Sequence, residues 1–184
     1  LNPIDGEEIR LQAQAFMPDI SPGYLVHVGK FKKQKDHATL IRAYAASQRR
    51  VPLVLVGTGP EQDDCRALAA ELGVADRVIF AGFQPNPYPY IAHAGCMVLS
   101  SRFEGCPLVI GEALALGVPV ISTDCESGPR ELLPPHCLVP VGDVSALAEK
   151  MDMLTAHPET FVSPFHEALL PQRVAQDYLR IITA

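Results

Sequence analysis

Residues 97–122 read MVLSSRFEGCPLVIGEALALGVPVIS, three apolar runs separated by a Gly/Pro turn and by Gly117. The first run, Met97–Leu99, and the last, Val118–Ser122, have the length and character of strands. The middle run, Leu108–Gly117, is long enough for a helix, and its final glycine suits a helix C-terminus. A strand, a helix and a second strand in this order predict one unit of a parallel sheet.

The same alternation continues on both sides of this unit. We expect further helices after the strands and a short helix at each terminus, the last one over Gln172–Ile182 with Pro171 in its first turn. The fold class is therefore α/β, a Rossmann-like parallel sheet of about six strands with helices on both faces. The other expected strands are Tyr24–Val28, Leu53–Val56, Val78–Phe80 and Leu138–Val139.

Composition limits the classes of function. A net charge of −6 argues against a nucleic-acid-binding surface, which would usually be basic. The five cysteines are odd in number and lack paired CxxC spacing, so we expect reduced thiols in a cytoplasmic protein rather than a disulfide framework or a zinc site. No apolar run approaches the ~20 residues that cross a bilayer.

Two glutamates mark the central unit. Glu104 lies in the Gly/Pro turn, and Glu112, after seven intervening residues, is the only charge in its apolar helix. Burying a carboxylate without partners costs roughly several kcal/mol, so something must satisfy Glu112. The two hydroxyls of a bound ribose would do so, and so would an arginine or a backbone N–H of the core. The sequence leaves both possibilities open.

A lysine-rich loop follows the first strand. Residues 29–35 read GKFKKQK, with four lysines in six residues. At the carboxyl edge of a parallel sheet such lysines can bind phosphate, although a solvated basic loop is the plainer interpretation. The start of the helix at Leu108 and Val109 also offers free N–H groups to an anion, while Glu104 could instead cap the same helix.

Other motifs are weaker. Residues 57–62, GTGPEQ, lack the third glycine of a dinucleotide fingerprint and predict a tight strand-to-helix turn. Residues 127–131, SGPRE, follow the fifth strand and bring either a ligand-contacting glycine or an ordinary turn before a short helix. His27 and His93 are predicted to be structural, and Ser100-Ser101 lacks the turn of a hydrolase nucleophile.

These features together resemble a known family. Gly29, Lys30 and Lys35, the glutamate pair, Gly82-Phe83 and the run 119–132 are similar to the C-terminal, nucleotide-sugar-binding domain of retaining glycosyltransferases. The family is the large family 4 (glycosyl transferases group 1), and its members have the GT-B fold, of which this chain would be the C-terminal half. The chain departs from it at Lys30, where arginine is commoner and would offer a bidentate fork.

The resemblance implies roles for individual residues. Lys30 and Lys35 would bind the donor diphosphate and stabilise its leaving charge, and Glu104 would position the donor sugar; we expect these three to be the catalytic group. No metal or other cofactor is expected. The donor-binding residues implied are Gly29, Phe83 and Gln84 around the base, Leu108 and Val109 at the phosphates, and Glu112 at the ribose.

The resemblance also implies an organisation. Residues 1–22 would be an interdomain linker and first helix, and residues 23–156 the nucleotide-sugar-binding Rossmann-like domain. Residues 157–184 would be a Pro-rich segment and a C-terminal helix returning towards a missing N-terminal domain, which would bind the acceptor. We therefore expect a fragment, inactive in transfer on its own, of a cytoplasmic enzyme whose full-length form associates peripherally with the membrane.

The predicted function is transfer of a sugar, with retention, from a nucleotide-diphosphate sugar to a glycan or lipid-linked saccharide in polysaccharide biosynthesis. By family frequency the donor is a UDP-sugar, and guanine is the alternative base. One alternative is a sugar-nucleotide epimerase of similar fold, which needs His and carboxylate acid/base groups in the cleft. A second alternative is a non-catalytic nucleotide-sugar-binding module. A dehydrogenase is disfavoured by the missing third glycine.

Overall fold

The computed structural model describes residues 3–48, 50–165 and 169–182, and its centre is a sheet of six parallel strands. The strand order is β3-β2-β1-β4-β5-β6, and every neighbouring pair is parallel. The predicted fold class is thus confirmed. The strands are β1 (Leu25–Val28), β2 (Leu53–Val56), β3 (Val78–Gly82), β4 (Cys96–Leu99), β5 (Val120–Thr123) and β6 (Leu138–Val139).

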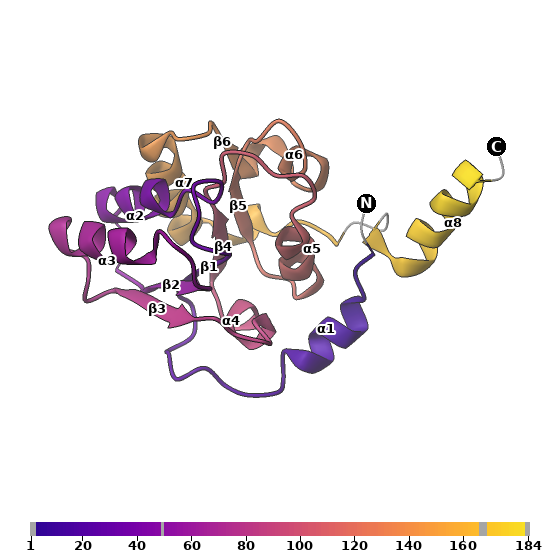
Figure 1. The fold of residues 1–184 in the computed structure, drawn as a ribbon, viewed down its shortest axis with the longest axis horizontal. Coiled ribbons are helices and arrows are strands. Elements are labelled where there is room, and N and C mark those ends of the chain that lie inside the picture. The colour runs from indigo at the N-terminus through magenta and orange to yellow at the C-terminus, as the bar shows by residue number, and fades with distance from the viewer. Residues whose placement is uncertain (1–2, 49, 166–168, 183–184) are drawn as a thin grey trace.

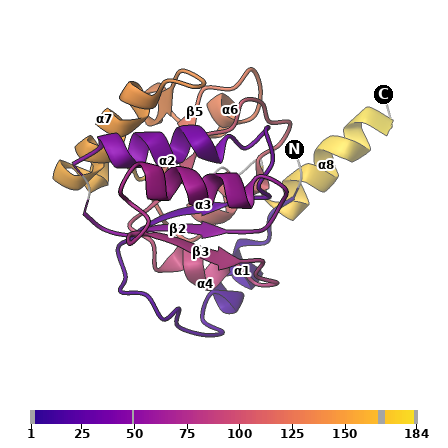
Figure 2. The same ribbon diagram turned by 60° about the vertical axis from the view of Figure 1, so that its left-hand side comes forward.

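Helices cover both faces of the sheet (Figures 1 and 2). On one face α2 packs beside α3 and α7, and on the other α1, α4 and α5 pack together. The helices are α1 (Gly6–Gln12), α2 (His37–Ala46), α3 (Gln62–Glu71), α4 (Tyr88–Ala92), α5 (Leu108–Ala115), α6 (Pro129–Leu132), α7 (Val144–Ala156) and α8 (Pro171–Ile182), with 3-10 turns η1 (Pro135–Cys137) and η2 (Pro158–Phe161).

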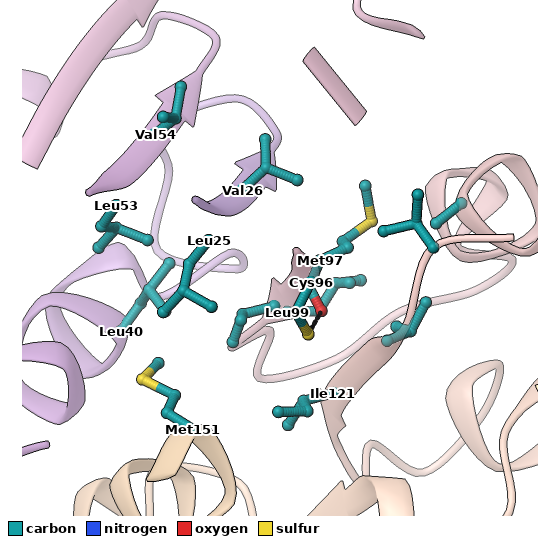
Figure 3. Packing of buried hydrophobic residues seen from close by; sticks show 14 of the residues in the cluster. Leu25, Val26, Leu40, Leu53, Val54, Cys96, Met97, Leu99, Ile121 and Met151 are labelled. Atoms are coloured by element: carbon teal, nitrogen blue, oxygen red, sulfur yellow. Dashed lines mark hydrogen bonds between the residues drawn. The ribbon is translucent and has the colours of Figure 1, made fainter. Parts of the chain in front are cut away.

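The core is formed by the strands and the inner faces of these helices. All four residues of β2 and of β4 are buried, as expected for strands covered on both sides. Figure 3 shows Leu25 of β1 beside Leu40 of α2, with Met151 of α7 on the same face. Burying each such side chain contributes about 1.5–3 kcal/mol.

Several boundaries differ from the sequence expectation for local reasons. Strand β5 begins at Val120, not at Val118, because the Val118 N–H closes the end of α5 on the carbonyl of Ala113, 3.0 Å away, and Pro119 has no N–H to donate. The turns η1 and η2 were not predicted, because each is too short to show periodicity.

The terminal segments meet at one point. The Ile4 N–H donates to the carbonyl of Leu169 at 2.7 Å, and helix α1 packs against α4 and α5, so this first segment belongs to the folded body. Helix α8 extends away from the sheet (Figure 1). The division at residues 22 and 156 stays a prediction. None of the helices in the described ranges is long and apolar enough to cross a membrane.

Candidate functional site

The strand order places a topological switch point between β1 and β4. Strand β1 pairs with β2 on one side and β4 on the other, so the direction of winding reverses there. In open α/β sheets ligands bind at this point, outside the carboxyl ends of the strands. The two loops that leave these ends are residues 29–36, here called the lysine loop, and residues 100–107, here called the glutamate loop.

The Gly57-Thr-Gly59 turn supports the lysine loop. The Gly29 N–H donates to the Val56 carbonyl at 2.9 Å, and Phe31 donates to Thr58 at 3.1 Å. A Cβ atom on Gly57 would lie 2.1 Å from the Gly29 oxygen, and one on Gly59 would lie 2.3 Å from the Phe31 oxygen. The glycines are therefore needed for close approach of two backbones, and the predicted tight turn is confirmed.

A hollow of about 470 Å³ opens beside this turn. Four predicted site residues line it together: Gly29, Lys30, Phe83 and Gln84. The Phe83 side chain is free to meet a ligand because it is 71% exposed. The lining is completed by Val28, Val56, Gly57, Thr58 and Pro87. A larger hollow between α2 and α3 carries side chains of both charge signs and includes none of the predicted site residues.

Lys35 and Glu104 are in direct contact. The Lys35 Nζ atom lies 2.5 Å from Glu104 Oε1, and their side chains are only 15% and 6% exposed. Ser101 Oγ donates to the same oxygen at 2.5 Å. Sequence reasoning considered Ser101 only as a nucleophile and missed this role; its position three residues before Glu104 was the available signal.

Behind this contact lie two buried histidines. The rings of His27 and His37 are 4.5 Å apart, and His27 Nδ1 is 2.8 Å from the Val98 carbonyl. Because a carbonyl only accepts, Nδ1 carries the hydrogen and the prediction of a structural role for His27 is supported. Burial lowers the pKa of His27 to about 4 and that of His37 to about 2, so both rings are neutral at neutral pH.

The start of α5 differs from the expectation. The Leu108 N–H donates to the Cys106 carbonyl at 2.9 Å, so it is not the free donor that was predicted. The Val109 N–H does lack a hydrogen-bond partner among the described residues. No side chain caps the helix, so Glu104 does not serve as a cap. Of the two backbone amides predicted to bind an anion at this helix, only the Val109 N–H is therefore available.

Glu112 has a partner that the sequence did not reveal. Its half-buried carboxylate interacts with the Tyr88 hydroxyl of α4, rather than with an arginine or a backbone N–H. Burial raises the pKa of Glu112, and the tyrosine hydrogen bond offsets part of that rise. Glu112 is not among the residues that line the hollow; its partner Tyr88 directly follows Pro87, which does line it.

The segment after β5 supports the glutamate loop. Ser127 Oγ donates to the Glu104 carbonyl at 2.5 Å. A Cβ atom on Gly128 would lie 2.5 Å from Pro107 Cδ, so this glycine allows close approach of the two loops. Among the described residues no cluster of three or more His, Cys, Asp or Glu side chains could hold a metal ion.

The lysine loop, the hollow beside it and the Lys35–Glu104 ion pair all lie at the carboxyl edge of the parallel sheet. Residues 22–157 match the family model "Glycosyl transferases group 1". This match covers most of the chain, and the protein belongs to that family.

Relatives and solved structures agree with the family match. An N-acetylgalactosaminyltransferase of Campylobacter jejuni that acts on a diphospho-undecaprenol substrate is 40% identical over 133 residues, 71% of this chain and 36% of that protein. A lipopolysaccharide 1,6-galactosyltransferase of Salmonella typhimurium is 36% identical over 120 residues, 62% of this chain and 33% of that protein. The chain thus spans about a third of the length of these curated relatives.

Solved structures share the fold. The galactosyltransferase WaaB in its apo form superposes with a TM-score of 0.76 at 23% identity, over 98% of this chain and 54% of that one. Anabaena HepE in complex with UDP-glucose gives a TM-score of 0.77 at 22% identity, again over 98% and 54%. At this identity the likeness establishes the fold, which is the Rossmann-like half of GT-B glycosyltransferases.

Proposed function

We propose that the chain is the donor-binding part of a retaining glycosyltransferase that uses a nucleotide-diphosphate sugar, with UDP as the nucleotide. The observation that carries this proposal is the gathering of Gly29, Lys30, Phe83 and Gln84 around one hollow at the carboxyl ends of β1, β2 and β3. The stem of Lys35, which pairs with Glu104, lies beside Gly29 of this lining. Its volume of about 470 Å³ falls within the ~300–1,000 Å³ of small-molecule sites. UDP complexes of structural neighbours support uracil as the base.

In this proposal each residue acts on a different part of the donor. Phe83 and Gln84 frame the base, with the Gln84 side chain anchored on the Ala81 carbonyl at 2.8 Å. Glu112 accepts from the ribose hydroxyls in place of Tyr88. Lys30, Lys35 and the Val109 amide hold the diphosphate, and Glu104 faces the sugar. These side chains supply the positive charge without a resident metal.

The reaction we propose keeps the anomeric configuration. The bond between the anomeric carbon and the phosphate oxygen breaks, and its electron pair goes to the leaving diphosphate, whose charge the lysines stabilise. The acceptor hydroxyl attacks from the same face and gives its proton to the leaving phosphate oxygen. We propose a glycan or lipid-linked saccharide as acceptor, because the relatives are named for such substrates, and a cytoplasmic location where nucleotide sugars are made.

The epimerase alternative finds no support in the site. It needs His and carboxylate acid/base groups in the cleft, and no histidine is among the described residues that line the hollow. The non-catalytic module remains the competing proposal. It predicts that Lys35→Ala leaves the full-length protein fully functional, whereas the transferase predicts loss of transfer.

Titration calorimetry of this chain with UDP, GDP and uridine tests the donor site. We expect UDP to bind, and Lys30→Met to weaken UDP by about tenfold while leaving uridine unaffected, since only UDP carries phosphate. Glu112→Ala should weaken both ligands, because both carry the ribose. Failure of UDP and GDP to bind at millimolar concentration, with no effect of Glu112→Ala, contradicts the proposal.

A further inference from the structure

The lysine loop and the glutamate loop are joined along their length. The Gln34 carbonyl accepts from the Arg102 N–H at 2.8 Å, and Gln34 Nε2 donates to the Phe103 carbonyl at 2.9 Å. One residue further on, Ser100 Oγ donates to the Lys35 carbonyl at 2.8 Å. The backbone on both sides of the ion pair is therefore fixed by hydrogen bonds from the opposite loop.

The glutamate loop is also held from β5. The Thr123 hydroxyl donates to the Ser101 carbonyl at 2.6 Å, and Cys125 Sγ donates to the same oxygen at 3.0 Å. Ser127 fixes the Glu104 carbonyl, as described above. With its backbone bonded on two sides, the glutamate loop has little freedom to follow a ligand. The part that is free to move is the outer end of the Lys35 side chain, because its four-carbon stem is flexible.

Glu104 already binds Lys35, the cation that the diphosphate of the proposed donor needs. A charge pair with so little exposed surface is less screened by water than a surface pair, so Glu104 is a strong partner for Lys35. A lysine already bound to a carboxylate must give up that bond to bind a phosphate. Ser101 Oγ contacts the same carboxylate oxygen and would hold Glu104 in place if Lys35 left.

The distance that Lys35 has to travel is short. A Cβ atom built on Gly29 would lie 3.5 Å from Lys35 Cδ and 3.5 Å from Cε, so the lysine stem lies over Gly29. Gly29 in turn lines the hollow. Rotation about the last side-chain bonds would move the ammonium group from Glu104 towards the hollow, without any change in the backbone.

We propose that Glu104 is an internal competitor for Lys35: a nucleoside diphosphate takes Lys35 from Glu104 on binding, and Glu104 recovers it when the product leaves. This inference rests on the proposed donor site. Glu104 thereby weakens the hold on the product nucleotide, which favours its release, and Ser101 keeps the carboxylate directed at the sugar during the exchange. Ser101 is in this respect a positioning residue.

A double-mutant cycle on this chain measures the competition, with UDP as the ligand in titration calorimetry. Glu104→Gln keeps the shape and an acceptor for Ser101 but removes the charge that competes for Lys35, so UDP should bind about fivefold tighter. Lys35→Met should weaken UDP by about tenfold. In the Lys35→Met background, Glu104→Gln should change UDP affinity by less than about twofold, because there is no longer a lysine to release.

Matched controls separate local from general charge effects. Glu149→Gln removes an exposed carboxylate on α7, and Arg42→Met removes an exposed cation on α2, outside the lysine loop. Each should change UDP affinity by less than about twofold at 0.15 M salt, because exposed charges are screened there. Near-ultraviolet circular dichroism and a urea midpoint for every variant show that the fold is kept.

Three outcomes overturn the exchange. If Glu104→Gln tightens UDP equally with and without Lys35, Glu104 acts by repelling the diphosphate and not by holding the lysine. If Glu104→Gln weakens UDP or leaves it unchanged while Lys35→Met still weakens it, the donor site stands and the competition is wrong. If UDP does not bind the unaltered chain, the proposed function fails and the exchange fails with it.

Discussion

The hollow beside Phe83 and the contact between Lys35 and Glu104 share one loop but differ in what fills them. The hollow is open, and Phe83 is 71% exposed beside it. The ion pair leaves no such space, because Lys35 and Glu104 are bound to each other and Glu104 also accepts from Ser101. The difference indicates that the nucleoside would enter a ready space, while the phosphates would have to displace an existing bond. In the proposed donor complex, recognition of the nucleoside and stabilisation of the phosphate charge would therefore fall to different parts of the lysine loop.

Gly57→Ala should disrupt both regions, since both depend on the lysine loop. Gly57 has φ +138° and a Cβ there would lie 2.1 Å from the Gly29 oxygen, so we expect about 4 kcal/mol loss in the free energy of unfolding. Urea unfolding measures it. Gly73→Ala is the control, because Gly73 has φ +68° but open space around it, and it should lose about 1 kcal/mol. Equal losses would refute the close-approach argument.

Acidification should lower the free energy of unfolding through the buried histidines behind the ion pair. The folded state favours neutral His27, whose pKa is lowered to about 4, whereas the unfolded chain binds the proton near pH 6.5. The contribution is therefore complete above pH 6.5 and is lost as the pH falls towards 4, by about 3 kcal/mol. Lys35, Glu104 and His37 are the charged or titratable groups that act on this ring.

The measurement is the free energy of unfolding in urea at pH 7.5, 5.5 and 4.5. His27→Asn keeps a donor for the Val98 carbonyl but does not titrate, so its loss of stability between these pH values should be smaller than that of the unaltered chain. A variant with an undiminished loss would show that the acid sensitivity arises elsewhere. His37 should account for part of the slope that remains, because its pKa is lowered further still.

Phe83→Ala should affect ligand binding at the hollow and leave the Lys35–Glu104 contact unchanged. Removing this exposed ring should weaken UDP by about fivefold, roughly 1 kcal/mol, and change the free energy of unfolding by less than about 0.5 kcal/mol. Met153→Ala is the matched control, because Met153 is 50% exposed on α7, which packs on the other face of the sheet from α4. A similar loss of UDP affinity in both variants would mean that Phe83 has no specific contact with the base.

Local patterns predicted the elements well, and the site less completely. Strand β2 was predicted with its observed limits because a continuous apolar run between Pro52 and Gly57 has no other stable placement. The partner of Glu112 could not be predicted, because Tyr88 lies on another helix and is brought to it only by packing of α4 against α5. The use of the Leu108 N–H was missed for a similar reason: it depends on how the Cys106 turn closes.

The sequence by itself determined the alternating strands and helices, the placement of the lysines and Glu104 after strand ends and of Glu112 in a helix, and the resemblance to the glycosyltransferase family. These follow from periodicity, turn residues and spacing, which are local properties of the chain. The tertiary structure decided the strand order and the partners of the site residues. Lys35 and Glu104 are separated by 69 positions, and only the pairing of β1 with β4 brings them to 2.5 Å.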